Sequence, residues 1–423
     1  MKNFDFGRYA CSCGLVAVML AGCGGLRQPF DSVQGDVNGA PPVTQSAVKT
    51  PTGSAYRVLY NFGSYATDGR IPEGSLINLK DTLYGTTLSG GSGCYASGGC
   101  GTVFAITTSG EETVLHNFSG STDGALPYAG LVNVSGVLYG TTGGGASSGG
   151  TVFSITPSGT ENVLHDFKGT PDGFDPQAAL IGVGGTLYGT TAYGGSDGQG
   201  TVFSITVSGG ETVLHNFGGM GTHGSYPEAS LLQVNGRLFG TTYKGVPGER
   251  GTVFEITRSG NGHVAHVFIG TSKDGSFPRA GLIDVDGTLY GTTSGGGRGN
   301  CEGCGNHEHY GTIFAITPAG KERLLYKFQG YPKDGAVPDG ELLYAGGIFY
   351  GTTESGGANC AISHGCGTIF SITRSGSEKV LYSFLPRDGA HPVSGLIDVN
   401  GRLYGTTPNG GTHDEGTVYS LSQ

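Results

Sequence analysis

The sequence predicts an all-β protein, a seven-bladed β-propeller of four-stranded antiparallel blades. Two strand-like motifs recur along its 423 residues. The motif GTT begins at Gly85, Gly140, Gly189, Gly240, Gly291, Gly351 and Gly405, and GT[VI][FY] begins at Gly101, Gly150, Gly200, Gly251, Gly311, Gly367 and Gly416. Successive GTT motifs, taken as differences between these positions, are 49 to 60 residues apart. A strand-rich repeat of about 50 residues is typical of a propeller blade.

One repeat unit, residues 129–167, shows the four strands expected in each blade. It reads AGLVNV, VLYGTT, GTVFSIT and ENVLHDF, with SG between the first two segments and PSGT between the last two. Short glycine-containing turns favour antiparallel hairpins, and the first turn recurs as VNG or VDG. Each unit is therefore predicted to be an antiparallel meander. We expect the small residues of GTT to let adjacent blades approach closely.

The two ends of the repeat region indicate how the ring closes. A fourth-strand motif, RVLYNF at Arg57–Phe62, precedes every other element, whereas the last unit ends after its third strand. The N-terminal strand should therefore complete the last blade and remove two open sheet edges. This assigns residues 56–423 to the propeller.

The start of the chain has the features of an export signal. Lys2 and Arg8 precede a short apolar stretch that ends in LAGC, Leu20–Cys23. LAGC resembles the bacterial lipobox, although a chance match is the alternative. The resemblance implies a lipoprotein signal peptide at 1–22, lipidation of Cys23 and, because residue 24 is not Asp, an outer-membrane or cell-surface location. Residues 23–55 have few large apolar side chains, which predicts a flexible tether.

Composition restricts the kinds of partner. The formal net charge is −10, charged residues make up 13% of the chain, and no basic stripe is present. These features disfavour nucleic acid and anionic lipid surfaces. We expect a monomer that meets the membrane only through its lipid anchor.

A second repeated motif, DG followed by proline, lies between the fourth strand of one unit and the first strand of the next. Its leading residues are Asp68, Asp123, Asp172, His223, Asp274, Asp334 and Asp388. In a meander these loops share a face with the loops after GTT. They form a candidate ligand face, a ring of carboxylates around one channel mouth that would take a cation, Ca²⁺ for example, or sugar hydroxyls. The alternative is a repeated Asx-type turn with a structural role.

Six cysteines lie in pairs in the loops after GTT. The pairs are Cys94 and Cys100, Cys301 and Cys304, and Cys360 and Cys366. Local pairing in an exported protein predicts three disulfides. The alternative for the second pair is a tetrahedral zinc site made of Cys301, Cys304, His307 and His309. Apart from these cations, no cofactor is expected.

The fourth strands carry a repeated ring position with no sign of catalysis. It holds His116, His165, His215 and His266 in four units and Tyr60, Tyr326 and Tyr382 in three. Exchange of His for Tyr within one chain predicts a packing and hydrogen-bonding role. The sequence has no nucleophile-elbow motif and no phosphate-binding loop ahead of a helix, so we predict no catalytic residue.

The motifs LYGTT, GTVF.IT and LH.F resemble the GloVer-type tandem repeat of bacterial extracellular proteins over Arg57 to Leu421. The resemblance implies export and defines no activity. We expect a surface-anchored, non-catalytic binding protein for a glycan or another envelope component. A polysaccharide-acting hydrolase or lyase and a structural surface-assembly protein are the alternatives. The loops at 88–100, 294–310 and 354–366 are the longest candidates for recognition.

Overall fold

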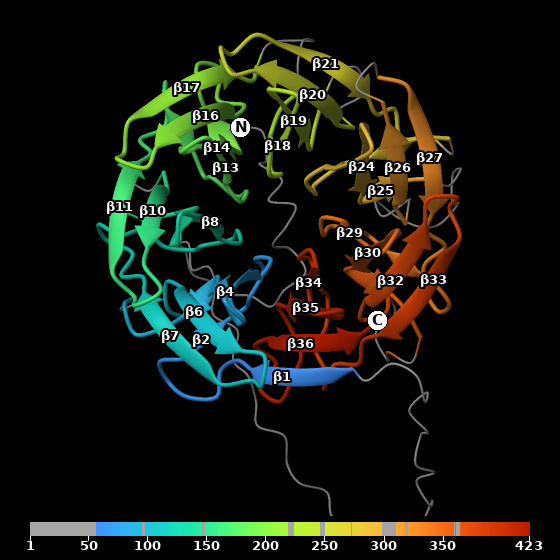
Figure 1. Ribbon diagram of the computed structural model, residues 1–423, viewed down its shortest axis with the longest axis horizontal. Helices are drawn as coiled ribbons and strands as arrows, with labels where there is room; N and C mark the ends of the chain where they lie inside the picture. Colours follow the sequence, from blue (N-terminus) through green and yellow to red (C-terminus); the bar gives the residue numbers. More distant parts are fainter. Residues whose placement is uncertain are drawn as a thin grey trace, which may run out of the picture. The chain divides into compact units, whose positions relative to one another are not determined.

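The computed structural model describes residues 56–94, 98–145, 149–218, 224–245, 250–271, 273–297, 310–317, 320–358, 360 and 364–423. Within these residues the chain forms seven four-stranded antiparallel sheets and no helix, arranged as a β-propeller (Figure 1). The predicted fold is therefore confirmed.

The strands of the first four blades run from the innermost to the outermost in chain order. They are β3 (Ile77–Leu79), β4 (Thr82–Thr87), β6 (Thr102–Thr107) and β7 (Glu112–Asn117) in blade 1; β8 (Val132–Val134), β9 (Val137–Thr142), β10 (Thr151–Ile155) and β11 (Glu161–Asp166) in blade 2; β13 (Ile181–Val183), β14 (Thr186–Thr191), β16 (Thr201–Thr206) and β17 (Glu211–Asn216) in blade 3; and β18 (Leu232–Val234), β19 (Arg237–Thr242), β20 (Thr252–Thr257) and β21 (Gly262–Val267) in blade 4.

The last three blades follow the same order. They are β23 (Ile283–Val285), β24 (Thr288–Thr293), β26 (Thr312–Ile316) and β27 (Glu322–Lys327) in blade 5; β29 (Leu343–Ala345), β30 (Ile348–Thr353), β32 (Thr368–Thr373) and β33 (Glu378–Ser383) in blade 6; and β34 (Ile397–Val399), β35 (Arg402–Thr407), β36 (Thr417–Ser422) and β1 (Arg57–Asn61) in blade 7. As predicted, the N-terminal strand β1 completes the last blade, with Arg57 opposite Ser420 and Asn61 opposite Thr417.

A second, shorter strand pairing recurs once per blade, on one face of the propeller, and was not predicted. The DG loop pairs with the chain just after GTT, which places both loops on the same face. Four blades form two-stranded ribbons, and three form single bridges. The ribbons are β2 (Gly69–Arg70) with β5 (Ser89–Gly90), β12 (Gly173–Phe174) with β15 (Tyr193–Gly194), β22 (Gly275–Ser276) with β25 (Gly295–Gly296), and β28 (Gly335–Ala336) with β31 (Ser355–Gly356). The bridges join Ala125 to Gly144, Ser225 to Lys244 and Ala390 to Asn409.

The GTT motif serves packing within a blade as well as between blades. Gly85 lies opposite Phe104, and a Cβ at Gly85 would come within 2.6 Å of that ring. The glycine therefore makes room for an aromatic ring of its own blade, and not for a closer neighbouring blade as the sequence suggested. The first threonine does reach the next blade, because Thr86 Oγ1 donates to the Ala129 carbonyl at 2.8 Å. The second, Thr87, bonds Thr102 within the blade at 2.7 Å.

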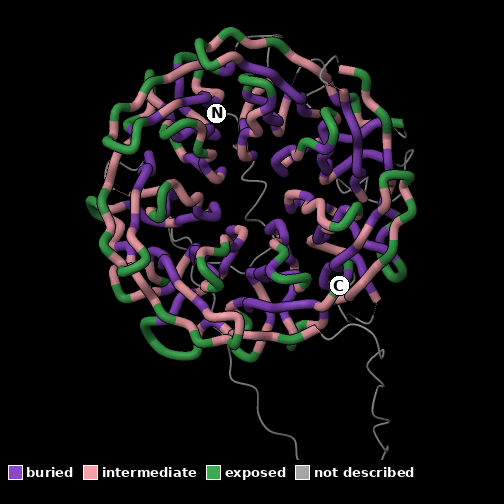
Figure 2. Tube along the Cα trace, viewed as in Figure 1, coloured by how far each residue is buried: buried purple, intermediate pink, exposed green. Residues whose placement is uncertain are grey.

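Neighbouring blades meet through buried aromatic pairs. The phenylalanine that ends each LH.F-type motif contacts the third-strand ring of the next blade edge to face, as Phe118 contacts Phe153 with 5.1 Å between centroids. The equivalent pairs are Phe62–Phe104, Phe167–Phe203, Phe217–Phe254, Phe268–Phe314, Phe328–Phe370 and Phe384–Tyr419. Edge-to-face contact is a favoured geometry for aromatic rings. Buried residues accordingly concentrate in the middle strands of each blade (Figure 2).

Candidate functional site

The DG-motif aspartates are held against the outermost strands. In three units a histidine ring faces the carboxylate, and in three a tyrosine hydroxyl donates to it. The His Nε2 to Asp Oδ distances are 3.2 Å for His116–Asp123, 3.1 Å for His165–Asp172 and 3.5 Å for His266–Asp274. The tyrosine bonds are 2.9 Å for Tyr60–Asp68, 2.9 Å for Tyr326–Asp334 and 2.7 Å for Tyr382–Asp388. The predicted structural role of the His/Tyr position is borne out by these contacts.

Backbone donors complete the environment of these carboxylates. Asp123, for example, accepts a hydrogen bond from the Ser119 amide at 3.0 Å. Four equivalent aspartates accept in the same way: Asp68 from Ser64, Asp172 from Lys168, Asp274 from Ile269 and Asp334 from Gln329. These amides lie four or five residues before each aspartate, so the bonds close the loop and give the aspartates a structural role, although not through the Asx turn that the alternative named. The six described carboxylates thus lie beside the outermost strands and not around the channel mouth. The seventh position, His223, lies outside the described residues.

A glutamate from the next blade lies near the aspartate in five of these six pairs, and the sequence analysis did not identify it. Glu112, Glu161, Glu211, Glu322 and Glu378 each begin an outermost strand. The Oε1 atom of each is buried and makes no hydrogen bond. We call each set of His or Tyr, Asp and next-blade Glu an outer junction. The recurrence of Glu at the start of five fourth strands was the available signal.

Burial of these glutamates raises their pKa values. Burial, reinforced by the Asp68 carboxylate, raises the pKa of Glu112 to about 7. The pKa of Glu161 rises to about 7 through burial and Asp123, and that of Glu378 to about 7 through burial and Asp334. Burial disfavours the charged form of a carboxyl group, and a second nearby carboxylate adds to the effect. The outer junctions therefore place paired carboxyl groups between blades.

A different arrangement is found in blades 3 to 5, on the propeller face that carries the DG loops. Aromatic side chains cluster there. The ring centroids of Tyr193 and Tyr226 are 5.3 Å apart, and those of Tyr243 and Phe277 are 5.2 Å apart. The ammonium group of Lys244 lies 5.5 Å from the Tyr226 centroid and 5.9 Å from the Tyr243 centroid. We define the blade 3–5 patch as Phe174, Tyr193, Tyr226, Glu228, Tyr243, Lys244, Phe277, Arg279 and Asp339.

Two of these rings occupy a strained backbone position that recurs in every blade. Tyr226 and Phe277 each precede a proline and have φ of 59°. The same left-handed position holds Ile71, Leu126, Asp175, Val337 and His391 in the other blades. Non-glycine residues rarely adopt this conformation, so the surrounding structure must enforce it. Here the Tyr226 amide donates to the Gln199 carbonyl, and its carbonyl accepts from the Tyr243 amide, each at 2.9 Å.

A charged group lies under the aromatic rings. The Arg279 side chain is 10% exposed, and its guanidinium carbon lies 4.4 Å from the Tyr243 centroid. Its Nε is 3.9 Å from Glu228 Oε2, and its Nη1 is 3.9 Å from Asp339 Oδ2. Glu228 Oε2, Arg279 Nε and Asp339 Oδ1 are buried and make no hydrogen bond. Oppositely charged side chains thus lie close together, but three of their buried polar atoms have no hydrogen-bond partner.

The inner end of this sector approaches the channel axis. Ser230 Oγ of blade 4 donates to Glu341 Oε2 of blade 6 at 3.3 Å, across the intervening blade 5. Contact between two non-adjacent blades is only feasible near the centre of the ring. Burial raises the pKa of Glu341 to about 7. The charged groups Glu228 and Asp339 lie two residues before Ser230 and Glu341 along the chain.

Two of the three predicted disulfides are present. Cys94 pairs with Cys100 and Cys360 with Cys366, with Cα–Cα distances of 5.6 and 5.7 Å. Disulfides of this kind favour an oxidising, exported environment. The third pair, Cys301 and Cys304, and the proposed zinc ligands His307 and His309 lie outside the described residues, as does Cys23. No helix among the described residues is long and apolar enough to span a membrane.

The seven repeated blades, with the outer junctions between them, define a class of protein, the β-propellers assembled from tandem repeats. The model of the Gloeobacter/Verrucomicrobia repeat matches residues 46–172, 96–304 and 302–423. The chain belongs to that repeat family, as the sequence motifs predicted. No curated protein matches the sequence.

Solved structures with the same kind of fold are distant in sequence. A europium-containing methanol dehydrogenase is 10% identical, with a TM-score of 0.50 over 87% of this chain and 93% of that one. A puromycin hydrolase S511A mutant complexed with PGG is 11% identical, with a TM-score of 0.50 over 81% of this chain and 50% of that one. A putative gluconolactonase is 13% identical, with a TM-score of 0.41 over 71% and 89%. These likenesses concern the fold alone.

Proposed function

We propose that this protein is a non-catalytic binding protein that recognises a glycan through the blade 3–5 patch. The observation that carries the proposal is the aromatic cluster seated on partly unsatisfied charged groups. Sugar rings have apolar faces that stack on aromatic rings and hydroxyl groups that require polar partners. Tyr193 and Tyr243 supply rings, and Glu228, Arg279 and Asp339 supply donors and acceptors.

The unsatisfied atoms support a polar ligand over an apolar one. Leaving a buried donor or acceptor unpaired costs about 1–3 kcal/mol. Both Glu228 Oε2 and Arg279 Nε are buried, so a small rotation of these side chains on binding would be needed for a sugar hydroxyl to bond them and recover part of that cost. A purely apolar ligand would leave these atoms unsatisfied and would bind less favourably. This supports the proposal of a hydroxyl-rich ligand, either a free polysaccharide or an envelope glycan.

The first experiment is a broad polysaccharide and glycan array probed with the full-length protein, with and without EDTA. We expect binding that persists in EDTA, because stacking and hydrogen bonds need no metal. Tyr193→Ala should abolish the signal, whereas Tyr331→Ala, a control at a 47%-exposed tyrosine outside the patch, should not. Absence of any glycan binding would contradict the proposal, and self-association of ligand-free protein would then favour the surface-assembly role.

The second candidate is a polysaccharide hydrolase or lyase, and Glu341 is the observation that favours it. A carboxyl group with a pKa near 7 beside a binding patch suits general acid catalysis. Release of new reducing or unsaturated ends from a bound polysaccharide, lost in Glu341→Gln, would establish that function. Binding without product would leave the non-catalytic role.

We also propose that the protein is an outer-membrane or cell-surface lipoprotein attached through Cys23. The support is the LAGC motif, the disulfides and membership of the repeat family. Metabolic labelling with a palmitate analogue should mark the wild type and not Cys23→Ser. Equal labelling of both, or of neither, would contradict this anchor.

A further inference from the structure

One outer junction differs from the others in how closely its side chains meet. His165 lies near the end of β11 in blade 2, Asp172 follows in the connecting loop, and Glu211 begins β17 in blade 3. One donor atom from each lies within 4.8 Å of the other two. The closest pair is His165 Nε2 and Asp172 Oδ2 at 3.1 Å. An imidazole and two carboxylates thus converge between two blades.

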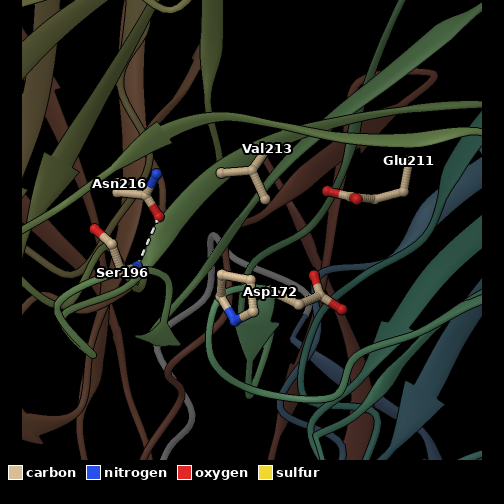
Figure 3. Close-up of a pocket in the computed structure, with 6 residues that line it drawn as sticks. Asp172, Ser196, Glu211, Val213 and Asn216 are labelled. Carbon is tan, nitrogen blue, oxygen red and sulfur yellow. Dashed lines mark hydrogen bonds between the residues drawn. The ribbon is translucent and has the colours of Figure 1, made fainter.

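The same place has an open surface pocket. Its volume is about 350 Å³, and it is lined by Pro171, Asp172, Ser196, Glu211, Val213 and Asn216. Asp172 and Glu211 turn their carboxyl groups toward the same space (Figure 3). Glu211 Oε1 is buried there and makes no hydrogen bond. The space admits an ion together with water molecules that would complete its coordination.

The other junctions of the ring provide an internal comparison. His116, Asp123 and Glu161 are the same residue types, as are His266, Asp274 and Glu322. Among the described residues, neither set brings three donor atoms within the same limit. At two further junctions, tyrosine replaces histidine and donates its hydroxyl proton to the aspartate. Among the outer junctions that the structure describes, the repeated motif has therefore become a compact donor set at one position only.

We propose that His165, Asp172 and Glu211 bind a divalent transition-metal ion, Zn²⁺, that joins the outermost strands of blades 2 and 3. Imidazole nitrogen is a preferred ligand of zinc, whereas Ca²⁺ takes oxygen ligands. His165 would ligate through Nε2, with its ring proton on Nδ1, in place of its contact with Asp172. Two carboxylates balance the charge of the ion, and Glu211 Oε1 gains the partner it lacks. Water from the open pocket fills the fourth position.

The test is calorimetric titration of EDTA-treated, full-length protein with zinc, together with its melting temperature in zinc. His165→Tyr is the key variant, because Tyr60 occupies the equivalent place at the junction of blades 7 and 1. The fold accepts that side chain, but the phenol is a poor zinc ligand. We expect His165→Tyr to weaken binding by at least about tenfold, because loss even of a residue that only orients a metal ligand costs about that much affinity. It should also abolish the zinc-dependent rise in melting temperature.

Two controls isolate this site. His116→Tyr makes the same change at the junction of blades 1 and 2 and should leave zinc binding intact. A Cys301→Ser and Cys304→Ser double variant removes two of the four ligands of the other candidate site and should keep the His165-dependent binding. Zinc binding that is unchanged in His165→Tyr, or lost only in the double variant, would overturn the proposal. Failure of the wild type to bind zinc, or equal stabilisation by Ca²⁺, would also overturn it.

Discussion

The outer junctions and the blade 3–5 patch use the repeat in opposite ways. At the outer junctions, nearly the same side chains return at each blade, such as His116 with Asp123 and Tyr60 with Asp68. In the patch, the backbone repeats but the side chains do not. Tyr226 in blade 4 and Leu126 in blade 2 share one left-handed position. Side chains that recur in each blade are those that stabilise the ring. Side chains that vary on the same backbone are available to bind a ligand.

The largest expected effect comes from the repeated core. Phe203→Ala removes a fully buried ring that packs on Phe167 and over Gly189. The free energy of unfolding should fall by about 3–5 kcal/mol, measured by denaturant unfolding. Phe174→Ala, at an exposed patch ring, is the matched control and should change stability by less than about 0.5 kcal/mol. Similar losses in both variants would refute the distinction between core and patch.

The second effect concerns an outer junction. Asp123→Ala removes the acceptor for the His116 ring and the Ser119 amide. Stability should fall by about 1–3 kcal/mol because partly buried donors lose their partner. Thermal unfolding measures the loss, and ligand binding should be unchanged. Normal stability combined with lost binding would instead assign this aspartate to the ligand face predicted from the sequence.

The third effect should appear in affinity and not in stability. Tyr226→Leu gives blade 4 the side chain that blade 2 carries at the same backbone conformation, so the fold should tolerate it. Affinity for the glycan identified on the array should fall about tenfold, which is about 1.4 kcal/mol. Val337→Leu makes a change of similar kind outside the patch and should leave affinity unaltered. Equal affinities in all three proteins would remove Tyr226 from the site.

The fourth effect is a pH dependence at the junction of blades 7 and 1. The folded-state pKa of Glu112 is about 7 against an ordinary 4.5, so folding favours the protonated form. Its contribution to stability is therefore complete below pH 4.5 and is lost as the pH rises through 7. Glu112→Gln stays neutral, so its melting temperature relative to wild type should rise between pH 5 and pH 8. Glu111→Gln, at the exposed neighbouring residue, should run parallel to wild type. A parallel curve for Glu112→Gln would contradict the expectation.

The architecture was predictable because its signals are local and repeated. GTT and GTVF mark paired strands, and the position of RVLYNF at Arg57–Phe62 indicated the closure onto β36. The contact between His116 and Asp123 was within reach of the same reasoning, since both residues recur with nearly constant spacing. The position of Glu161 beside this pair could not be predicted in the same way, because Glu161 belongs to the next blade.

By itself, the sequence determined the number of blades, their strand order, the ring closure and two local disulfides. Hydrogen bonding between neighbouring segments and short loops decides these features, and both are visible along the chain. Only the tertiary structure decided which side chains meet between blades, such as His165 with Glu211 or Arg279 with Asp339. Those meetings depend on how blades pack around the axis, where residues about 50 positions apart come within a few ångströms of each other.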